Sequence, residues 1–148
     1  MKPILQTMFQ TWLFWAALSA GFAALTAIFA KLGVQTLNPD FATFLRTVVI
    51  LLLLAAVVQA TGQWQPLGQI SGTGVAFLVL SALATGASWI CYFRALKLGD
   101  AARVAPVDKL SVVLVAIMGA MLLGEKLSVP NWIGVALIFS GVVLVAVR

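Results

Sequence analysis

The sequence has no histidine and a single cysteine, Cys91, among its 148 residues. An internal disulfide is therefore excluded, and the imidazole and thiolate ligands that zinc and haem sites require are missing. The four acidic residues form no paired-carboxylate motif, and no glycine loop leads into Lys-Ser or Lys-Thr. This inventory predicts that the protein is not an enzyme and holds neither a metal nor a cofactor.

Charge is also scarce. Only 9% of the residues are charged, whereas 63% are hydrophobic and the mean hydropathy is +1.12. Because a soluble domain of this size carries roughly a quarter charged residues, the sequence predicts that a lipid bilayer is the main solvent. Five spans of about 20 residues would use nearly the whole chain, so a single domain over residues 1–148 is expected.

The apolar residues form five nearly continuous runs, separated by turns rich in glycine, proline and asparagine. The runs lack the period-two alternation of barrel strands, which favours helices. The sequence therefore predicts an all-α membrane bundle, with spans at about 11–32, 41–60, 73–98, 101–123 and 132–147.

An odd number of spans puts the two termini on opposite sides of the membrane. The side of the N-terminus carries Lys2 and Lys126, and the other side carries Lys31, Arg46, Arg94, Lys97, Arg103 and Arg148. Since short cytoplasmic loops are enriched in Lys and Arg, the C-terminus is predicted to be cytoplasmic in a multi-pass protein of the cell (inner) membrane. The same rule explains the net charge of +5 without a nucleic-acid partner.

Two charged residues, Asp108 and Lys109, fall inside the fourth apolar run. Lys109 lies about 12 Å from the start of that span at 1.5 Å per residue, a depth at which a charge faces a partner or a wet cavity. We expect Asp108 to form a structural ion pair with Arg94 or Arg46, which leaves Lys109 to face a cavity. Pro106 lacks a backbone donor and is expected to break the helix beside them. The alternative is an ion-pair lock with Lys109 extended to the interface.

Small residues one turn apart, such as Ala16, Ala20 and Ala24 in the first span, are predicted to allow close helix packing. The aromatic residues Trp89 and Tyr92 are interpreted as packing and lipid contacts rather than a stacking site.

Several stretches resemble the EamA family of the drug/metabolite transporter superfamily. They are FAALTAIFAKLGV, NPDFATFLRTVVIL, SALATGASWICYFRALKLGDAARVAPVDKLSVVLVAI and GEKLSVPNWIGVALIFSGVVLV, and the similarity runs from about Phe14 to Val147. The run from Tyr92 to Leu127 is its most specific part.

The resemblance implies a transporter of a small metabolite or drug-like solute that works by alternating access. Members usually have ten helices in two inverted five-helix units around a central cavity, and this chain supplies one unit. A homodimer or a partner membrane protein is therefore expected. An antiparallel pair would reproduce the inverted repeat, but the strong charge bias opposes dual insertion, so the orientation stays open.

Small multidrug exporters of the superfamily carry a buried glutamate in the first span, and this first span has no acid. Substrate binding by Lys109, Arg94 and Arg46 would favour an anionic, zwitterionic or phosphate-bearing solute. Two other functions remain open: a non-transporting accessory subunit of a larger membrane complex, and a flippase for lipid head groups.

Overall fold

The computed structural model describes residues 11–147. Within this range the chain is helical and contains no strand. Five helical segments are long and apolar enough to cross a membrane, which confirms the predicted all-α class. They are α2 (Trp12–Val34), α3 (Pro39–Thr61), α4 (Gly72–Leu98), the interrupted pair α5 (Ala101–Asp108) and α6 (Leu110–Leu122), and α7 (Val129–Ala146); a short 3₁₀ turn, η1 (Leu67–Gln69), precedes α4.

Polar side chains cap the beginnings of α3 and α4. The side-chain oxygen of Asn38 accepts hydrogen bonds from the backbone N–H groups of Asp40 (2.9 Å) and Phe41 (3.3 Å) at the start of α3. The hydroxyl of Ser71 accepts one from Gly74 at the start of α4, at 3.0 Å. These side chains satisfy donors that have no partner within the helix.

The last helix begins earlier than the sequence indicated. α7 starts at Val129, and Pro130 lies in its first turn. The sequence predicts a start at about Trp132, because proline is common in the turn before a helix. A proline in the first turn costs no helix hydrogen bond, since the N–H groups there have no helical acceptor.

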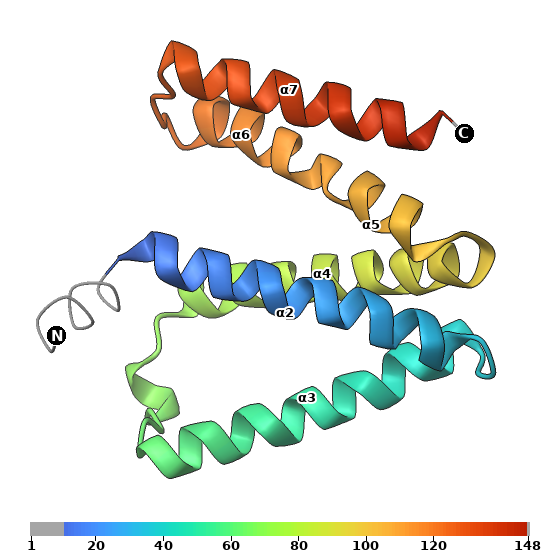
Figure 1. The fold of residues 1–148 in the computed structure, drawn as a ribbon. Coiled ribbons are helices and arrows are strands. Elements are labelled where there is room, and N and C mark those ends of the chain that lie inside the picture. The colour runs from blue at the N-terminus through green and yellow to red at the C-terminus, as the bar shows by residue number, and fades with distance from the viewer. Residues whose placement is uncertain (1–10, 148) are drawn as a thin grey trace, which may run out of the picture.

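The helices form two groups that meet at α5 (Figure 1). α3 packs on α2 and α4, whereas α6 packs only on α5 and α7 within the described residues. α5 contacts α2, α4 and α7 and therefore joins the two groups. Successive spans run in opposite directions, so the two ends of the described chain lie at opposite ends of the bundle.

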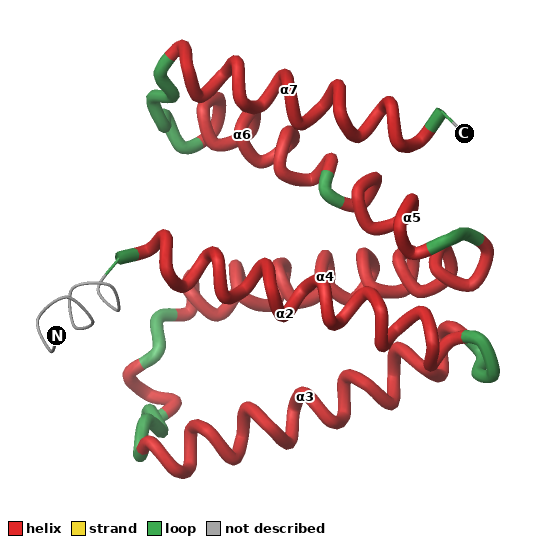
Figure 2. The backbone as a smooth tube through the Cα atoms, viewed as in Figure 1, coloured by secondary structure: helices red, strands yellow, loops and turns green. Residues whose placement is uncertain are grey.

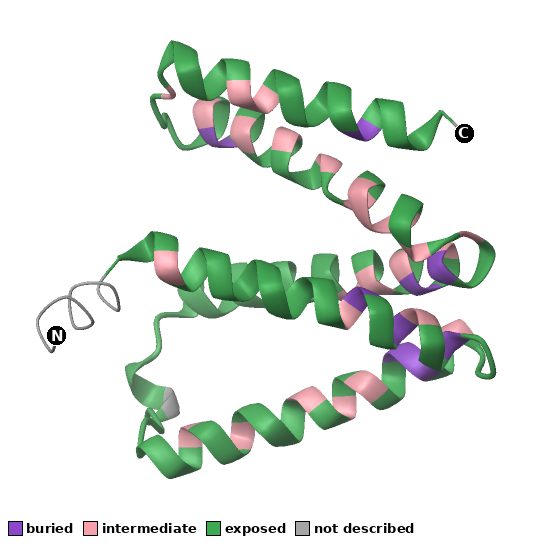
Figure 3. Ribbon diagram, in the orientation of Figure 1, coloured by how far each residue is buried: buried purple, intermediate pink, exposed green. Residues whose placement is uncertain are grey.

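One end of the bundle holds its buried core. We call it the basic end; it comprises the ends of α2, α4 and α7 and the beginnings of α3 and α5. The buried cluster there consists of Ala30, Val34, Ala42, Phe93 and Leu96 (Figure 3). Val34 and Leu96 are completely buried. α2, α3 and α4 converge at this end, and α3 diverges from α2 toward the other (Figure 1).

Two lysines connect α2 and α4 at the basic end. The ammonium of Lys31, in the last turn of α2, donates to the carbonyls of Leu96 and Gly99, both at 2.8 Å. The ammonium of Lys97, in the last turn of α4, donates to the carbonyls of Val34 (2.8 Å) and Gln35 (2.6 Å). Each lysine thus caps the C-terminus of the other helix, where carbonyls lack helical partners and the helix dipole favours a cation.

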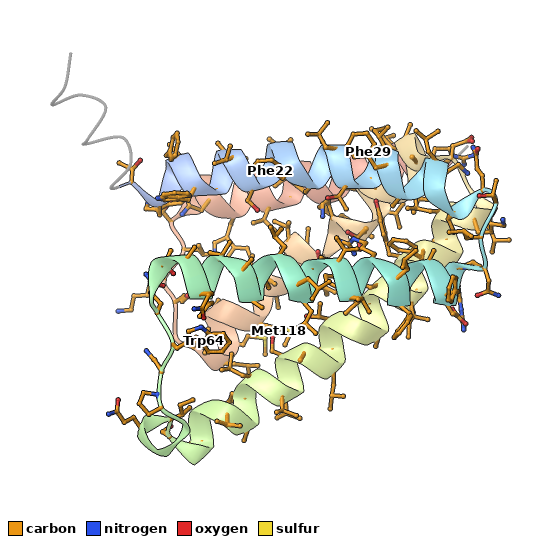
Figure 4. The ribbon with its side chains drawn as sticks, turned by 90° about the horizontal axis from the view of Figure 1, so that it is seen from below. Phe22, Phe29, Trp64 and Met118 are labelled. Carbon is orange, nitrogen blue, oxygen red and sulfur yellow. The ribbon has the colours of Figure 1, made fainter. Side chains whose placement is uncertain are left out.

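The rest of the surface is apolar and exposed. Large side chains on every helix face outward, among them Phe22, Phe29 and Met118 (Figure 4). A surface of this kind is suited to lipid or to another membrane-embedded chain rather than to water.

Candidate functional site

A cavity of about 580 Å³ lies where α2, α3, α4 and α5 meet. Three charged side chains line it: Arg46 from α3, and Asp108 and Lys109 from the α5–α6 interruption. Two cations and one anion leave an excess of one positive charge. Ionisable groups at such depth normally mark a solute or ion pathway.

Arg46 has no carboxylate partner among the described residues. Its guanidinium carbon lies 4.3 Å from the centroid of the Trp89 ring and 5.7 Å from that of Phe93. These cation–π contacts hold the side chain, which is half-buried. The donors of a guanidinium stacked in this way remain available for an anionic ligand.

The helix containing Pro106 is interrupted at Lys109, between α5 and α6 (Figure 2). Pro106 lies inside α5, where its ring nitrogen cannot donate to the carbonyl of Ala102. The N–H of Lys109 is shared between the carbonyls of Ala105 (3.3 Å) and Pro106 (3.0 Å). The interruption thus follows the proline by one turn and places the charged pair at an irregular point of the span.

Asp108 pairs with its neighbour. Its carboxylate accepts a hydrogen bond from the Lys109 ammonium at 3.1 Å. Our expectation that Asp108 would bind an arginine of another helix, most plausibly Arg94, is wrong. Adjacent residues on a regular helix point about 100° apart, but the interruption and the long lysine side chain allow these two groups to meet.

Arg94 forms its ion pair with a different carboxylate. Its guanidinium binds the carboxylate of Asp40, at the start of α3, through two hydrogen bonds of 2.9 and 2.7 Å. Both side chains are more than half exposed, and Arg94 does not line the cavity. The structure therefore brings Arg46 and Lys109 together and leaves Arg94 as a connection between α3 and α4.

The wall contributed by α2 is made of small residues. Ala20, Ala23, Ala24 and Ala27 line the cavity together with Thr26. Ala20 and Ala24 were predicted to allow close helix packing, but in this chain they provide space instead. Trp89 was interpreted as a packing residue; its position one turn before Tyr92 and Phe93 on α4 was the signal that these rings share a face.

A second cavity, of about 440 Å³, lies on the other side of α5, against α4 and α7. Its polar lining includes Cys91, Asp100 and Arg103, and Arg103 also donates to the carbonyl of Ala146 at 3.3 Å. Ser88, Tyr92 and Asp108 line both cavities. No group of three or more residues that could hold a metal ion occurs in the described part of the chain.

Five helical segments of membrane-spanning length define a multi-pass membrane protein, and four of its helices enclose a cavity with an excess of positive charge. The chain belongs to the EamA-like transporter family, whose profile matches residues 10–147. It is 66% identical over 140 residues to a Sinorhizobium sp. protein described as an uncharacterized transporter in the cobO 3′ region; the match covers 95% of this chain and 99% of that protein. No solved structure matches the chain.

Proposed function

We propose that this protein moves a small anionic or zwitterionic solute across the cell (inner) membrane by alternating access. The observation that carries the proposal is the cavity beside the α5–α6 interruption. Arg46 and Lys109 line this cavity, and Asp108 is the only anion in its lining. A fixed excess charge at this depth is costly unless a counter-charged solute or water accompanies it.

The helix arrangement supports movement between two states. The basic end is closed by the buried cluster and by the two lysine caps, whereas the helices diverge toward the other end. The interruption at Lys109 leaves α6 and α7 as a pair that contacts the rest of the unit only through α5. Such a pair can rock about the interruption while α2 and α4 stay together.

The proposal includes a second copy of the chain. The cavity is bounded by one five-helix unit, and the surrounding helix faces are apolar and exposed. The Sinorhizobium relative, 99% of whose length is matched by 140 residues, is also about the length of one unit. A homodimer would enclose the cavity as two units enclose it in ten-helix members.

The direct test is solute flux in proteoliposomes that contain the purified protein. Panels of small carboxylates, phosphate esters, zwitterions and organic cations would be screened by electrical recording on supported membranes. We expect concentration-dependent currents with anions or zwitterions and none with cations. Currents with cations alone would contradict the assignment, and no current with any solute would favour the accessory-subunit function.

The orientation is tested by reporter fusions after the C-terminal residue. Lys31, Arg94, Lys97 and Arg103 all lie at the end where α7 ends, while Lys2 and Arg148 lie outside the described residues. We expect only the cytoplasmic reporter to be active, because positive charge is retained on that side. Equal activity of cytoplasmic and periplasmic reporters would instead demonstrate dual insertion and an antiparallel pair.

The assembly is tested by native mass spectrometry from lipid nanodiscs. We expect a mass of two copies, because one unit leaves its cavity open to the bilayer. A complex with another polypeptide would support the accessory function, and a monomer active in flux would contradict the dimer.

A further inference from the structure

Asp108 lies in the wall between the two cavities. It faces the larger cavity beside Lys109 and Arg46, and it faces the smaller cavity beside Asp100 and Arg103. From α4, Tyr92 and Ser88 line both cavities with it, and Cys91 lines the smaller one. One carboxylate therefore borders both a cationic site and a separate polar cavity near the basic end.

The only ion-pair partner of Asp108 among the described residues is Lys109, at 3.1 Å. An anionic solute attracted by Arg46 and Lys109 would compete for the ammonium that Asp108 holds. Once both cations have turned to the solute, the carboxylate shares the site with a second negative charge. A nearby like charge disfavours the ionised form of a carboxylate and favours the uptake of a proton.

We infer that Asp108 is the proton-coupling group of this protein, and that its proton enters through the smaller cavity. The inference rests on the proposed function. Binding of one anion at Arg46 and Lys109 is accompanied by the uptake of one solvated proton from the aqueous solution by the Asp108 carboxylate, which becomes a neutral acid. One anion and one proton therefore move together. No covalent bond to the solute is made or broken.

The first test replaces Lys109 and needs no solute. Lys109→Met removes the ammonium and so imitates a site in which an anion has captured it. We expect infrared spectra at neutral pH to show the C=O stretching band of a protonated carboxyl group in Lys109→Met. The unmodified protein should not show this band. The band should disappear in Lys109→Met/Asp108→Asn, and the assignment is simple because the chain has four acidic residues.

Two variants make this test specific. Lys109→Arg preserves the cation and should therefore show no such band. Lys109→Met/Asp40→Asn should keep the band, because Asp40 belongs to the separate pair with Arg94. If Asp108 stays ionised in Lys109→Met, with Arg46 taking over as partner, the coupling role is overturned.

The second test uses the single native cysteine as a reporter of the smaller cavity. A charged, membrane-impermeant methanethiosulfonate should modify Cys91 when added from the side of the basic end, at least ten times faster than from the other side. Cys91→Ser supplies the blank. Modification only by a lipid-soluble maleimide would show that the cavity faces lipid, and would exclude it as the proton route.

Different results would contradict the transport function and the coupling role of Asp108. If the protein is no transporter, solute flux is absent for the whole panel, whereas the Asp108 band in Lys109→Met still appears. If transport is real but Asp108 is not coupled to it, flux persists in Asp108→Asn, with the same dependence on a pH gradient as in the unmodified protein. Loss of that dependence in Asp108→Asn, with anion binding retained, is the expected result.

Discussion

Replacing Arg46 or Lys109 with glutamine is expected to weaken solute binding by about 10- to 100-fold. Each cation can supply a charge-assisted hydrogen bond, worth about 1.5–3 kcal/mol. The double variant should abolish measurable flux, because the cavity then keeps only the negative charge of Asp108. Flux and equilibrium binding in proteoliposomes provide the measurement.

Thermal stability distinguishes a residue that binds the solute from one that stabilises the fold. Arg46 has no carboxylate partner, so Arg46→Gln removes an uncompensated charge from the span and should maintain or raise thermal stability. Lys109→Gln retains an amide donor for Asp108 and should cost little. Lys126→Gln, in the turn after α6, is the matched control and should leave both flux and stability unchanged.

An unfolded Arg46→Gln variant would show that the guanidinium is a structural group that packs on Trp89. Full flux in the Arg46→Gln/Lys109→Gln double variant would exclude both residues from the site. The prediction thus separates a solute-binding arginine from one that merely anchors α3 against α4.

The fold could be predicted because the bilayer allows few alternatives. Runs of about 20 apolar residues that must satisfy their own backbone become helices, and their number follows from the turns between them. The helix boundaries were harder to predict at prolines, because a proline can belong to a turn or to the first turn of a helix. Asn38-Pro39 ends a turn and begins α3 at once, and Pro130 lies inside α7 rather than before it.

The partners of the charged residues could not be predicted, because they depend on helix rotation and register. Nothing in the sequence distinguishes Asp40 from Asp108 as the partner of Arg94. In the structure the choice is set by which face of α4 meets the start of α3. In the same way, small residues along α2 permit either close packing or a cavity, and the position of α5 decides between them.

The lysines at the basic end show a signal that sequence analysis overlooked. Lys31 and Lys97 indicate the orientation of the chain, but each also lies in the last turn of a helix, where a cation stabilises the helix dipole. Two spans that are separated by one further span run in the same direction and therefore end on the same side of the membrane. The pattern therefore already allowed each lysine to reach the other helix.

Removing these two lysines is expected to give the largest loss of stability of any surface charge change in the chain. Lys31→Met and Lys97→Met each strand carbonyls at a helix end and should each cost about 1–3 kcal/mol, from the loss of hydrogen bonds to a charged group. Thermal unfolding in detergent measures the effect, with Lys126→Met as the control of equal size. The double variant should lose less stability than the sum of the two single losses, because both lysines hold the same pair of helix ends.

Since Val34 and Leu96 lie between the two caps, we also expect faster hydrogen exchange at the ends of α2 and α4 and not in α7. Stability equal to that of Lys126→Met would show that the buried cluster alone closes the basic end.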